Sequence, residues 1–354
     1  MQPNAELRSL VDRFSAARIA VVGDLVADEY VYGETDRVSR EAPVLIVRYE
    51  SSELKPGCGA NAVANLCALG SRVIPIGMVG DDETGGRLRT LLREVGADVS
   101  AVLTASGCST ATKTRVLAGG KNTRRQQMLR IDRDGPASPP AALLPRLLRA
   151  LKEAARDADA VMVSDYGAGL LSPPVIEAVL AIAESGKLVC ADSRYRLAQY
   201  RGVAAAKPNE VELEQLAGHP LGGDLAALED AGRDLLRTLR ARSLLITRGR
   251  AGMMLLRPGI AAALLPVHGS PTAVDVTGAG DTVMAADTLA LACGADPADA
   301  ARIANVAGSL VVQKPGTATV SAAELREELL RSPVARPHLA EERQDPARKK
   351  RARR

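Results

Sequence analysis

The chain of 354 residues contains very few aromatic side chains, with six Tyr, one Phe and no Trp. Because 46% of the residues are hydrophobic, the core must be built mainly from the aliphatic side chains of Leu, Val, Ile and Ala. Proteins that bind single-stranded nucleic acid stack the bases on aromatic rings. The scarcity of such rings argues against this function, and we expect no nucleic-acid partner.

The sequence also lacks the apolar segments that enter membranes. Residues 1–18 contain no signal-peptide hydrophobic stretch, and no run of about 18 apolar residues occurs. The five cysteines are odd in number and form no Cys-x-x-Cys pair, which is typical of a reduced cytosolic protein. We therefore expect a cytoplasmic protein with no membrane partner.

Three common catalytic motifs are missing as well. The chain has no G-x-x-x-x-G-K-[ST] P-loop, and its three His occur without an H-E-x-x-H motif or a Cys/His cluster. The segment GCGANA at residues 57–62 formally fits a dinucleotide fingerprint, but Pro56 argues against the buried strand that must precede it. These observations disfavour a P-loop kinase, a metalloenzyme and a dinucleotide-dependent enzyme.

Charge is balanced except at the C-terminus. The formal net charge of +4 comes from 46 Lys and Arg against 42 Asp and Glu. Residues 341–354 hold seven basic and three acidic side chains, which accounts for the whole excess. We interpret residues 333–354 as a disordered basic tail that follows one domain over residues 1–332.

Apolar strand patterns alternate with amphipathic helix patterns along most of this domain. Examples are the strands at 18–24 and 160–167 and the helix at 141–157. This alternation predicts a doubly wound α/β fold, in which helices flank a mostly parallel sheet. Residues 30–50 and 110–132 contain strand patterns without helices, so we expect them to form a small separate β-sheet that acts as a lid. The strand edges of such a lid favour pairing between two copies, and we expect a homodimer.

The segment DVTGAGDT, residues 275–282, places Gly-Ala-Gly directly before an acidic residue and an apolar helix. The first turn of a helix has unpaired N–H groups and a positive dipole end, and glycines let an anion approach them. We therefore predict an anion hole at Gly278, Ala279 and Gly280. Asp281 beside it would be the general base that takes a proton from a hydroxyl attacking phosphorus. The alternative is a tight turn with an Asp near the helix start.

Two further segments suit a nucleotide and its metal. In KPNEVE, Asn209 and Glu212 would share one side of a first helical turn and suit a hydrated Mg²⁺. The alternative is an N-cap Asn with a capping Glu, and the two interpretations are compatible. In ITRGRAGM, Thr247 and Gly249 would lie either under a nucleotide or in a plain hairpin.

Two N-terminal segments suit a sugar. GDLVAD predicts Asp24 and Asp28 at the end of the first strand, where ligands bind in α/β proteins. PGCGAN predicts Gly57, Gly59 and Asn61 at a helix start. Carboxylates and an amide that converge there would bind sugar hydroxyls.

These segments, in this order, resemble the PfkB/ribokinase family of sugar kinases over roughly residues 18–325. DVTGAGD matches the C-terminal signature of that family, and PGCGANAVANLCALG matches its N-terminal signature with Cys58 in place of a usual Gly. The Asn209-x-x-Glu212 pair matches its magnesium and phosphate motif. The resemblance implies a ribokinase-like fold and ATP-dependent phosphorylation of a sugar or a sugar phosphate.

Within the family, segments such as TKTRV, RRQQMLRID, VSDYG and GTATVS look most like the heptose 7-phosphate kinase branch. That branch makes the ADP-heptose precursor of lipopolysaccharide, and its bifunctional members carry a second nucleotidyltransferase domain. The length of this chain leads us to expect a stand-alone kinase. The alternatives are another kinase of the family, acting on a fructose phosphate, ribose or a nucleoside, and a catalytically idle sugar-binding or regulatory protein.

The resemblance also implies residue roles, with Asp281 as catalytic base beside the anion hole. For ATP and Mg²⁺ the implied contacts are Lys207, Asn209, Glu212, Thr247, Gly249, Gly252 and Asn305. For the sugar they are Asp28, Gly57, Gly59 and Asn61, with Lys113 and Arg115 on the lid meeting a sugar phosphate or remaining ordinary solvated charges. Asp275 and Thr277 resemble a site for a monovalent cation such as K⁺.

Three positions depart from the heptose kinase pattern. Arg40 stands where Pro is usual, ADSRYR at 191–196 replaces an Asp-Pro-Lys segment, and Lys207 replaces Thr before Pro-Asn. A Lys at this last position is common in other phosphosugar kinases. These departures bear on the identity of the sugar rather than on kinase activity.

Overall fold

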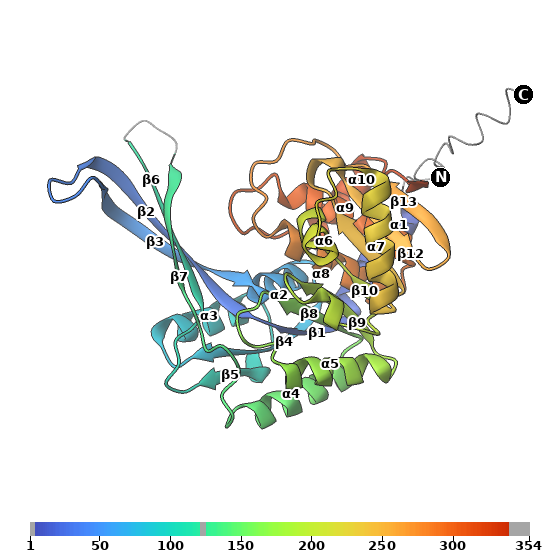
Figure 1. The fold of residues 1–354 in the computed structure, drawn as a ribbon, viewed down its shortest axis with the longest axis horizontal. Helices are drawn as coiled ribbons and strands as arrows, with labels where there is room; N and C mark the ends of the chain where they lie inside the picture. Colours follow the sequence, from blue (N-terminus) through green and yellow to red (C-terminus); the bar gives the residue numbers. More distant parts are fainter. Residues whose placement is uncertain (1–3, 121–124, 340–354) are drawn as a thin grey trace, which may run out of the picture.

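The computed structural model describes residues 4–120 and 125–339 of the chain. Within these residues the larger sheet has ten strands, in the order β14-β13-β12-β11-β10-β9-β8-β1-β4-β5 (Figure 1). The strands are β1 (Arg18–Gly23), β4 (Arg72–Gly80), β5 (Val102–Ala105), β8 (Ala160–Asp165), β9 (Leu188–Ser193), β10 (Ala205–Ala206), β11 (Ser243–Thr247), β12 (Met253–Arg257), β13 (Ile260–Leu265) and β14 (His338–Leu339). Neighbours from β5 to β11 are parallel, and only the pairs from β11 to β14 are antiparallel. The mostly parallel sheet predicted from the sequence is confirmed.

The core has two layers, one on each face of this sheet. Successive side chains of a strand point to opposite faces, and in β1 Ile19 and Val21 join one apolar cluster while Ala20 and Val22 join the other. The first cluster is covered by α1 (Ala5–Asp12), α2 (Gly59–Ala68), α3 (Glu83–Glu94), α8 (Ala279–Ala292), α9 (Pro297–Val311) and α10 (Ala322–Arg331). The second is covered by α4 (Leu144–Asp157), α5 (Pro173–Glu184), α6 (Glu210–Ala217) and α7 (Leu225–Leu239).

Helix α8, whose first turn contains Asp281, is deeply buried. Its residues from Asp281 to Ala290 are all buried, because it packs between α2, α9 and the central strands. Apart from Asp281, Thr282, Asp287 and Thr288, these buried residues are apolar, and a helix with so little polar surface is stable only in such a position. The packing of α8 therefore fixes its N-terminus, and with it Asp281.

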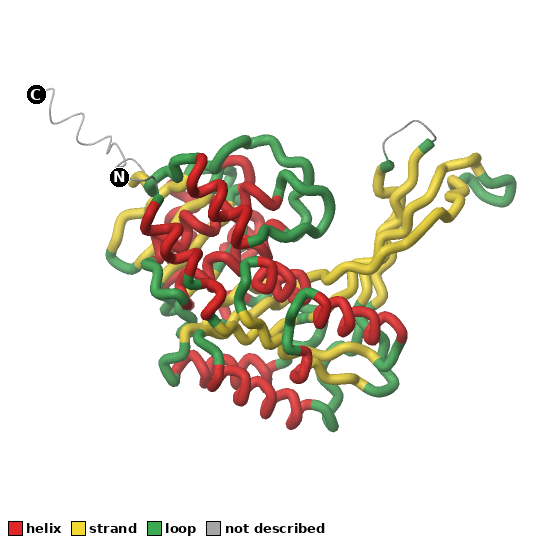
Figure 2. The backbone as a smooth tube through the Cα atoms, turned by 180° about the vertical axis from the view of Figure 1, so that it is seen from behind, coloured by secondary structure: helices red, strands yellow, loops and turns green. Residues whose placement is uncertain are grey.

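A second sheet, which we call the lid sheet, projects from the core in Figures 1 and 2. Its strands are β2 (Leu25–Val38), β3 (Leu45–Cys58), β6 (Thr112–Gly119) and β7 (Gln126–Arg133), in the order β3-β2-β6-β7. The outer pairs β2–β3 and β6–β7 are antiparallel and contain bulges, whereas the inner pair β2–β6 is parallel and in unbroken register from Ala27 and Thr112 to Glu34 and Gly119. The separate small sheet predicted from residues 30–50 and 110–132 is confirmed, although its strands begin earlier, at residue 25.

The structure differs from the prediction at residues 333–339, which the sequence placed in the tail. Val334 is only 7% exposed, and Arg302 Nη2 donates to its carbonyl oxygen at 3.1 Å. Farther on, β14 pairs with β13. These seven residues are held because the buried guanidinium of Arg302 needs acceptors, and the rest of the predicted tail, 340–354, lies outside the described residues. In the described part of the chain no helix has the length and apolar character to cross a membrane.

Candidate active site

Helix α8 begins in a turn that only glycine fits. Its N-cap residue, Gly278, has φ 76° and ψ 1°, and a Cβ atom there would lie 2.5 Å from Nδ2 of Asn61. The N–H of Ala279 donates to the Val276 carbonyl oxygen at 3.2 Å, so this member of the predicted anion hole already has a partner. The positive end of the helix dipole still lies at this turn, beside Gly278 and Gly280.

Asp281 lies in the first turn of α8 with only 2% of its surface exposed. Its Oδ2 accepts a hydrogen bond from Asn61 Nδ2 at 2.8 Å, and its Oδ1 accepts one from the Tyr166 hydroxyl at 2.9 Å. Burial and the charge of Asp192 raise the pKa of Asp281 to about 7, although these two hydrogen bonds and Lys207 oppose the rise. A carboxyl group with this pKa is suited to proton transfer near neutral pH.

Lys207, between β10 and α6, places a positive charge at the same turn. Its side chain is buried and forms an ion pair with Asp192, with Nζ 3.0 Å from Oδ2. A Cβ on Gly280 would lie 3.4 Å from Nζ, so the ammonium group lies beside the start of α8. Burial acts to lower the pKa of Lys207, but the charges of Asp192 and Glu212 outweigh it and raise the pKa. The group is therefore charged at neutral pH.

Asn209 and Glu212 form a capping box at the start of α6. The Glu212 N–H donates to Asn209 Oδ1 at 2.8 Å, and the Asn209 N–H donates to Glu212 Oε2 at 2.9 Å. The alternative of a capped helix start is thus confirmed, and it is compatible with a hydrated metal. In the described residues no three His, Cys, Asp or Glu side chains gather to hold a metal directly. A Mg²⁺ ion here would be held through water, using the carboxylate oxygen that the box leaves free.

A cavity of about 380 Å³ lies between the β11–β12 turn, α8 and α9. Its lining includes four of the seven predicted ATP and Mg²⁺ contacts and the first residues of α8: Thr247, Gly249, Gly252, Asn305, Ala279 and Gly280. Lys207, Asn209 and Glu212 are not part of this lining. At Gly252, with φ 85°, a Cβ would lie 2.0 Å from the Leu265 carbonyl oxygen, so glycine is required there. Asn305 is held by a 2.7 Å hydrogen bond from its Nδ2 to the Pro266 carbonyl oxygen. The size and the apolar walls fit a nucleotide.

Charged side chains of the lid sheet form a second group near Asp281. Asp28 lies in β2, not at the end of the first strand, and its Oδ1 is 2.7 Å from Arg115 Nη1. Gly57 in β3 leaves room for the Asp28 carboxylate, because a Cβ at residue 57 would lie 2.6 Å from Cγ of Asp28. The Arg115 side chain is 15% exposed. The alternative of an ordinary solvated charge is therefore wrong for Arg115.

Lys113 connects the lid sheet to Asp281 through Tyr166. It lies opposite Asp28 in the register of β2 and β6, and its Nζ is 5.5 Å from the centroid of the Tyr166 ring. The same Nζ donates to Sγ of Cys58 at 3.2 Å. Because the Tyr166 hydroxyl is bonded to Asp281, one aromatic ring lies between the lid ammonium group and the carboxylate.

Helix α2 supplies the remaining predicted sugar contacts. Its first residue, Gly59, donates its N–H to the Asp24 carbonyl oxygen at 2.9 Å. Asn61 follows in the first turn, and Asn65 Nδ2 donates to its Oδ1 at 3.2 Å. This contact orients the Asn61 amide so that its Nδ2 faces Asp281.

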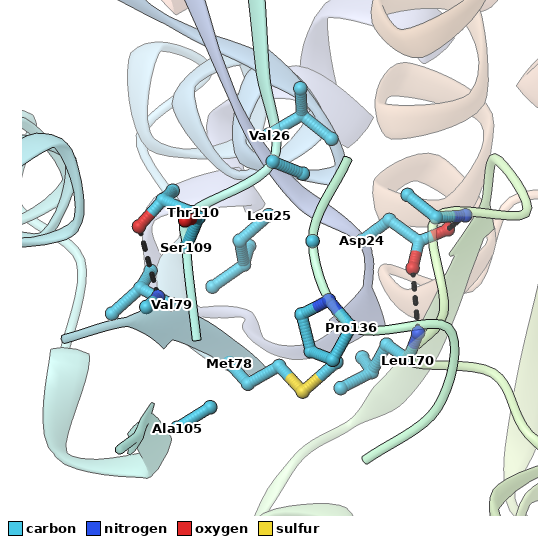
Figure 3. A pocket seen from close by; sticks show the side chains of 14 residues that line it. Asp24, Leu25, Val26, Met78, Val79, Ala105, Ser109, Thr110, Pro136 and Leu170 are labelled. Carbon is cyan, nitrogen blue, oxygen red and sulfur yellow. Dashed lines mark hydrogen bonds between the residues drawn. The ribbon is translucent and has the colours of Figure 1, made fainter. Parts of the chain in front are cut away.

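The prediction that Asp24 binds a sugar is wrong. Its Oδ2 accepts the N–H groups of Tyr166 and Ala168 and its Oδ1 accepts that of Leu170, at 2.8–3.0 Å. Figure 3 shows Asp24 beside Leu170 at the edge of a cavity of about 20 Å³, which has room for about one water molecule. Asp24 therefore holds the loop after β8, including Tyr166, and does not face an acceptor.

Asp275 ties the loop before α8 to the loop after α9. Its Oδ1 accepts the Thr277 N–H and its Oδ2 the Gly316 N–H, each at 2.9 Å. Burial acts to raise the pKa of Asp275, but these bonds outweigh it and lower the pKa, so the carboxylate is charged. The next residue, Thr317, has a buried hydroxyl without a hydrogen-bond partner in the described part of the chain. An ionised carboxylate near an unpartnered hydroxyl is compatible with the predicted monovalent cation.

Sequence reasoning missed Tyr166 and Asp192 as members of the site. Burial raises the pKa of Asp192 to about 6, although the ion pair with Lys207 acts to lower it. The carboxylate is therefore mostly charged at neutral pH. Tyr166 directly follows β8, and Asp192 lies at the end of β9. Ligands of open α/β sheets bind at the carboxyl ends of the strands, and this rule is the signal that would have found both residues.

The fold and this arrangement are those of an enzyme that moves a phosphoryl group between small molecules. The model of the pfkB family of carbohydrate kinases matches residues 16–324. The chain therefore belongs to this family and is a carbohydrate kinase.

Curated relatives and solved structures agree with this assignment. The chain is 41% identical to the bifunctional protein HldE of Caulobacter sp. (strain K31), covering 90% of this chain and 64% of that protein. It is 42% identical to the HldE protein of Methylococcus capsulatus, covering 88% of this chain and 64% of that protein. The chain thus spans just under two thirds of the length of these relatives.

Among solved structures, the Arabidopsis thaliana ribokinase complexed with ribose and ATP is similar, with a TM-score of 0.71, 22% identity and 89% and 99% of the two chains covered. Phosphofructokinase-2 of Escherichia coli, in complex with substrates and products, also has a TM-score of 0.71, with 19% identity and coverage of 88% and 98%. At these identities the likeness shows the fold, and the ribokinase-like fold predicted from the sequence is confirmed.

Proposed function

We propose that this carbohydrate kinase transfers the γ-phosphoryl group of ATP to the anomeric hydroxyl of D-glycero-D-manno-heptose 7-phosphate. The position of Asp281 carries the proposal, because this buried carboxylate lies at the start of α8, next to the cavity and to the cations of the lid sheet. The similarity to HldE proteins and the motifs shared with heptose 7-phosphate kinases support the choice of sugar.

In this mechanism Asp281 takes the proton of the acceptor hydroxyl as its oxygen attacks the γ-phosphorus and the bond to ADP breaks. Asn61 and Tyr166 hold the carboxylate in place, at 2.8 and 2.9 Å. The transferred group meets the first turn of α8 and the Lys207 ammonium group, which offset its negative charge. This charge replaces the Lys that a P-loop would supply.

ATP would occupy the cavity along Thr247, Gly249 and Gly252, with Asn305 near the adenine. Asn209 and Glu212 would hold Mg²⁺ through water, and the ion would neutralise phosphate charge. We also propose a monovalent cation such as K⁺ at Asp275 and Thr277, which the unpartnered Thr317 hydroxyl supports.

The acceptor would lie between α2 and the lid sheet, where Asp28, Gly57, Gly59 and Asn61 face its hydroxyls. Its phosphate would meet Lys113 and Arg115. Closure of the lid over both substrates would exclude water and limit ATP hydrolysis. We place this reaction in the cytoplasm, a location that the five free cysteines support.

The lid sheet also supports a proposal of a homodimer. Seven large apolar side chains on its strands and its β2–β3 turn are 40% to 63% exposed: Val38, Val44, Leu45, Tyr49, Met128, Leu129 and Ile131. Contiguous exposed apolar patches mark contact surfaces, and we propose that these side chains contribute to one. Multi-angle light scattering gives the mass in solution, and a monomer at micromolar concentration would contradict the dimer.

The test of the substrate is ATP-dependent ADP release with Mg²⁺ on heptose 7-phosphate, fructose 6-phosphate, fructose 1-phosphate, ribose and adenosine. We expect turnover mainly on the heptose phosphate. Turnover mainly on another acceptor would keep the kinase chemistry and reject the heptose. If all five acceptors are inert while a sugar phosphate still binds, the alternative of an idle sugar-binding protein is favoured instead.

A further inference from the structure

Cys58 has a backbone conformation that strongly disfavours any side chain. It joins β3 of the lid sheet to α2 of the core, with φ 52° and ψ −126°. The other described non-glycine residues with positive φ, Asn4 and Arg240, have ψ of 28° and 32° and lie in the ordinary left-handed region at helix ends. Strain of the kind seen at Cys58 persists only where the surroundings hold it, and it gathers at functional sites.

The thiol of Cys58 contacts Lys113, the lid cation whose ammonium group lies over the Tyr166 ring. Lys113 Nζ donates to Cys58 Sγ at 3.2 Å, and Cys58 is only 8% exposed. Because burial raises the pKa of this thiol to about 12, the group stays neutral and accepts the hydrogen bond without cancelling the charge of Lys113.

This contact restricts a side chain that is otherwise flexible. A lysine on a strand has four rotatable side-chain bonds and loses much rotamer entropy when it is fixed. Here the Cys58 sulfur and the Tyr166 ring, 5.5 Å from Nζ at its centroid, hold the ammonium group from two sides. Tyr166 in turn is bonded to Asp281 at 2.9 Å. The charge is thus fixed near the base before any acceptor arrives.

We propose that Cys58 is a positioning residue that fixes Lys113 for the anionic group of the acceptor. The inference rests on the proposed function in one respect, namely that the acceptor carries a phosphate that meets Lys113. The strained backbone is the consequence of placing a hydrogen-bond acceptor at the junction of β3 and α2, where glycine would relieve the strain but leave Lys113 free.

The experiment compares Cys58→Ala with Cys58→Ser in the full chain, with Cys67→Ala on the adjoining helix α2 as the matched control. We expect Cys58→Ala to raise KM for the sugar phosphate about five- to tenfold, since a hydrogen bond to a charged group is lost. The changes in kcat and in KM for ATP should stay within about twofold. Cys58→Ser keeps an acceptor atom and should restore KM to within about twofold of the parent. A role in packing alone would change the melting temperature but not this KM.

A double-mutant cycle with Lys113→Met separates this role from a general effect. If Cys58 acts through Lys113, Cys58→Ala has no further effect on KM in the Lys113→Met background. Independent effects that multiply would overturn the proposal, as would an unchanged KM in Cys58→Ala. Cys58→Gly, which relieves the strain, should melt no lower than the parent and yet share the high KM, so that loss of folding cannot explain the result.

The parent enzyme is assayed first, so that failure of the proposed function shows separately. If the parent turns over no phosphorylated sugar, the proposed substrate is rejected. The same cycle is then measured on the dissociation constant of inorganic phosphate by titration calorimetry. Coupling between Cys58 and Lys113 in that measurement supports the positioning role, and equal phosphate affinity in the parent and Cys58→Ala overturns it.

Discussion

The side of Asp281 that we propose for the nucleotide and the side that we propose for the acceptor are built differently. The nucleotide side is a cavity of about 380 Å³ with glycine backbone and apolar walls. On the acceptor side, charged groups already contact neighbouring side chains, as in the 2.7 Å pair of Asp28 with Arg115 and the 3.2 Å contact of Lys113 with Cys58. In this proposal a nucleotide would fill existing space, whereas an acceptor would have to join or replace existing hydrogen bonds. We expect discrimination between acceptors to depend on these charged groups, because unpaired buried polar groups penalise a wrong ligand.

The largest effect is expected where the two sides meet, at Asp281. Replacing Asp281 by Asn should lower kcat by about 10² to 10⁴, since the general base is lost, while the dissociation constant for ATP stays within about twofold. In the parent, kcat/KM should rise with pH up to about 7 and then level off, because the carboxylate must be deprotonated to act. Steady-state ADP release and calorimetry with ATP measure both effects.

Asp234→Asn is the matched control for this substitution, because Asp234 lies on α7 with 69% of its side chain exposed. It should leave kcat, kcat/KM and the dissociation constant for ATP unchanged. Near-parental kcat in Asp281→Asn, or an acid limb that persists in it, would show that another group is the base.

A smaller loss of kcat is expected when the ion pair of Lys207 and Asp192, beside the start of α8, is broken. Lys207→Met should lower kcat by about 10²- to 10³-fold, because a positive group at the transferred phosphoryl is lost. It should also lower the melting temperature, because Asp192 is left buried without its partner.

The double variant Lys207→Met with Asp192→Asn separates the two effects, and thermal unfolding beside the kinetic assay measures them. Removing both charges should recover much of the stability but none of the turnover. Recovery of kcat together with stability would mean that Lys207 serves only the fold.

The smallest of these effects is confined to the acceptor side. Arg115→Met should raise KM for the sugar phosphate about tenfold, because a charge-assisted contact is lost, with KM for ATP unchanged. Initial rates at varied concentrations of each substrate measure this split. Arg130→Met on β7 is the control, since that side chain is 51% exposed and pairs with Asp132 on its own strand. If KM for the sugar phosphate and KM for ATP rise together in Arg115→Met, the acceptor side and the nucleotide side are not independent.

The sequence was sufficient for those parts of the molecule that local pattern determines. Alternating apolar runs predicted the parallel sheet, because a buried strand such as β1 must be apolar on both faces. The glycines before Asp281 predicted a close approach of backbone to another group, and Asn61 is the side chain that a Cβ at Gly278 would meet. The family resemblance, rather than local pattern, implied that Thr247, Gly249, Gly252 and Asn305 lie around one ligand, and they line one cavity.

The rest depends on contacts between distant residues that no local pattern records. Tyr166 meets Asp281 across 115 positions of the chain, and nothing in the segment VSDYG itself shows that the ring turns toward α8. Asp24 illustrates the converse, because its place after β1 suggested a ligand site, while three backbone N–H groups of another loop take up its carboxylate. The pKa of Asp281 likewise follows from burial, which only the assembled core creates.

The unbroken parallel register of β2 and β6 limits how the lid can evolve. Asp28 faces Lys113 and Tyr30 faces Arg115 across this pair, and a slip of one residue would turn each charged side chain to the other face of the sheet. Single insertions in the paired segments 27–34 and 112–119 are therefore expected to be removed by selection. The outer pairs already contain extra residues as bulges. We therefore expect β3 and β7 to change length between lineages while the charged side chains of β2 and β6 keep their orientation.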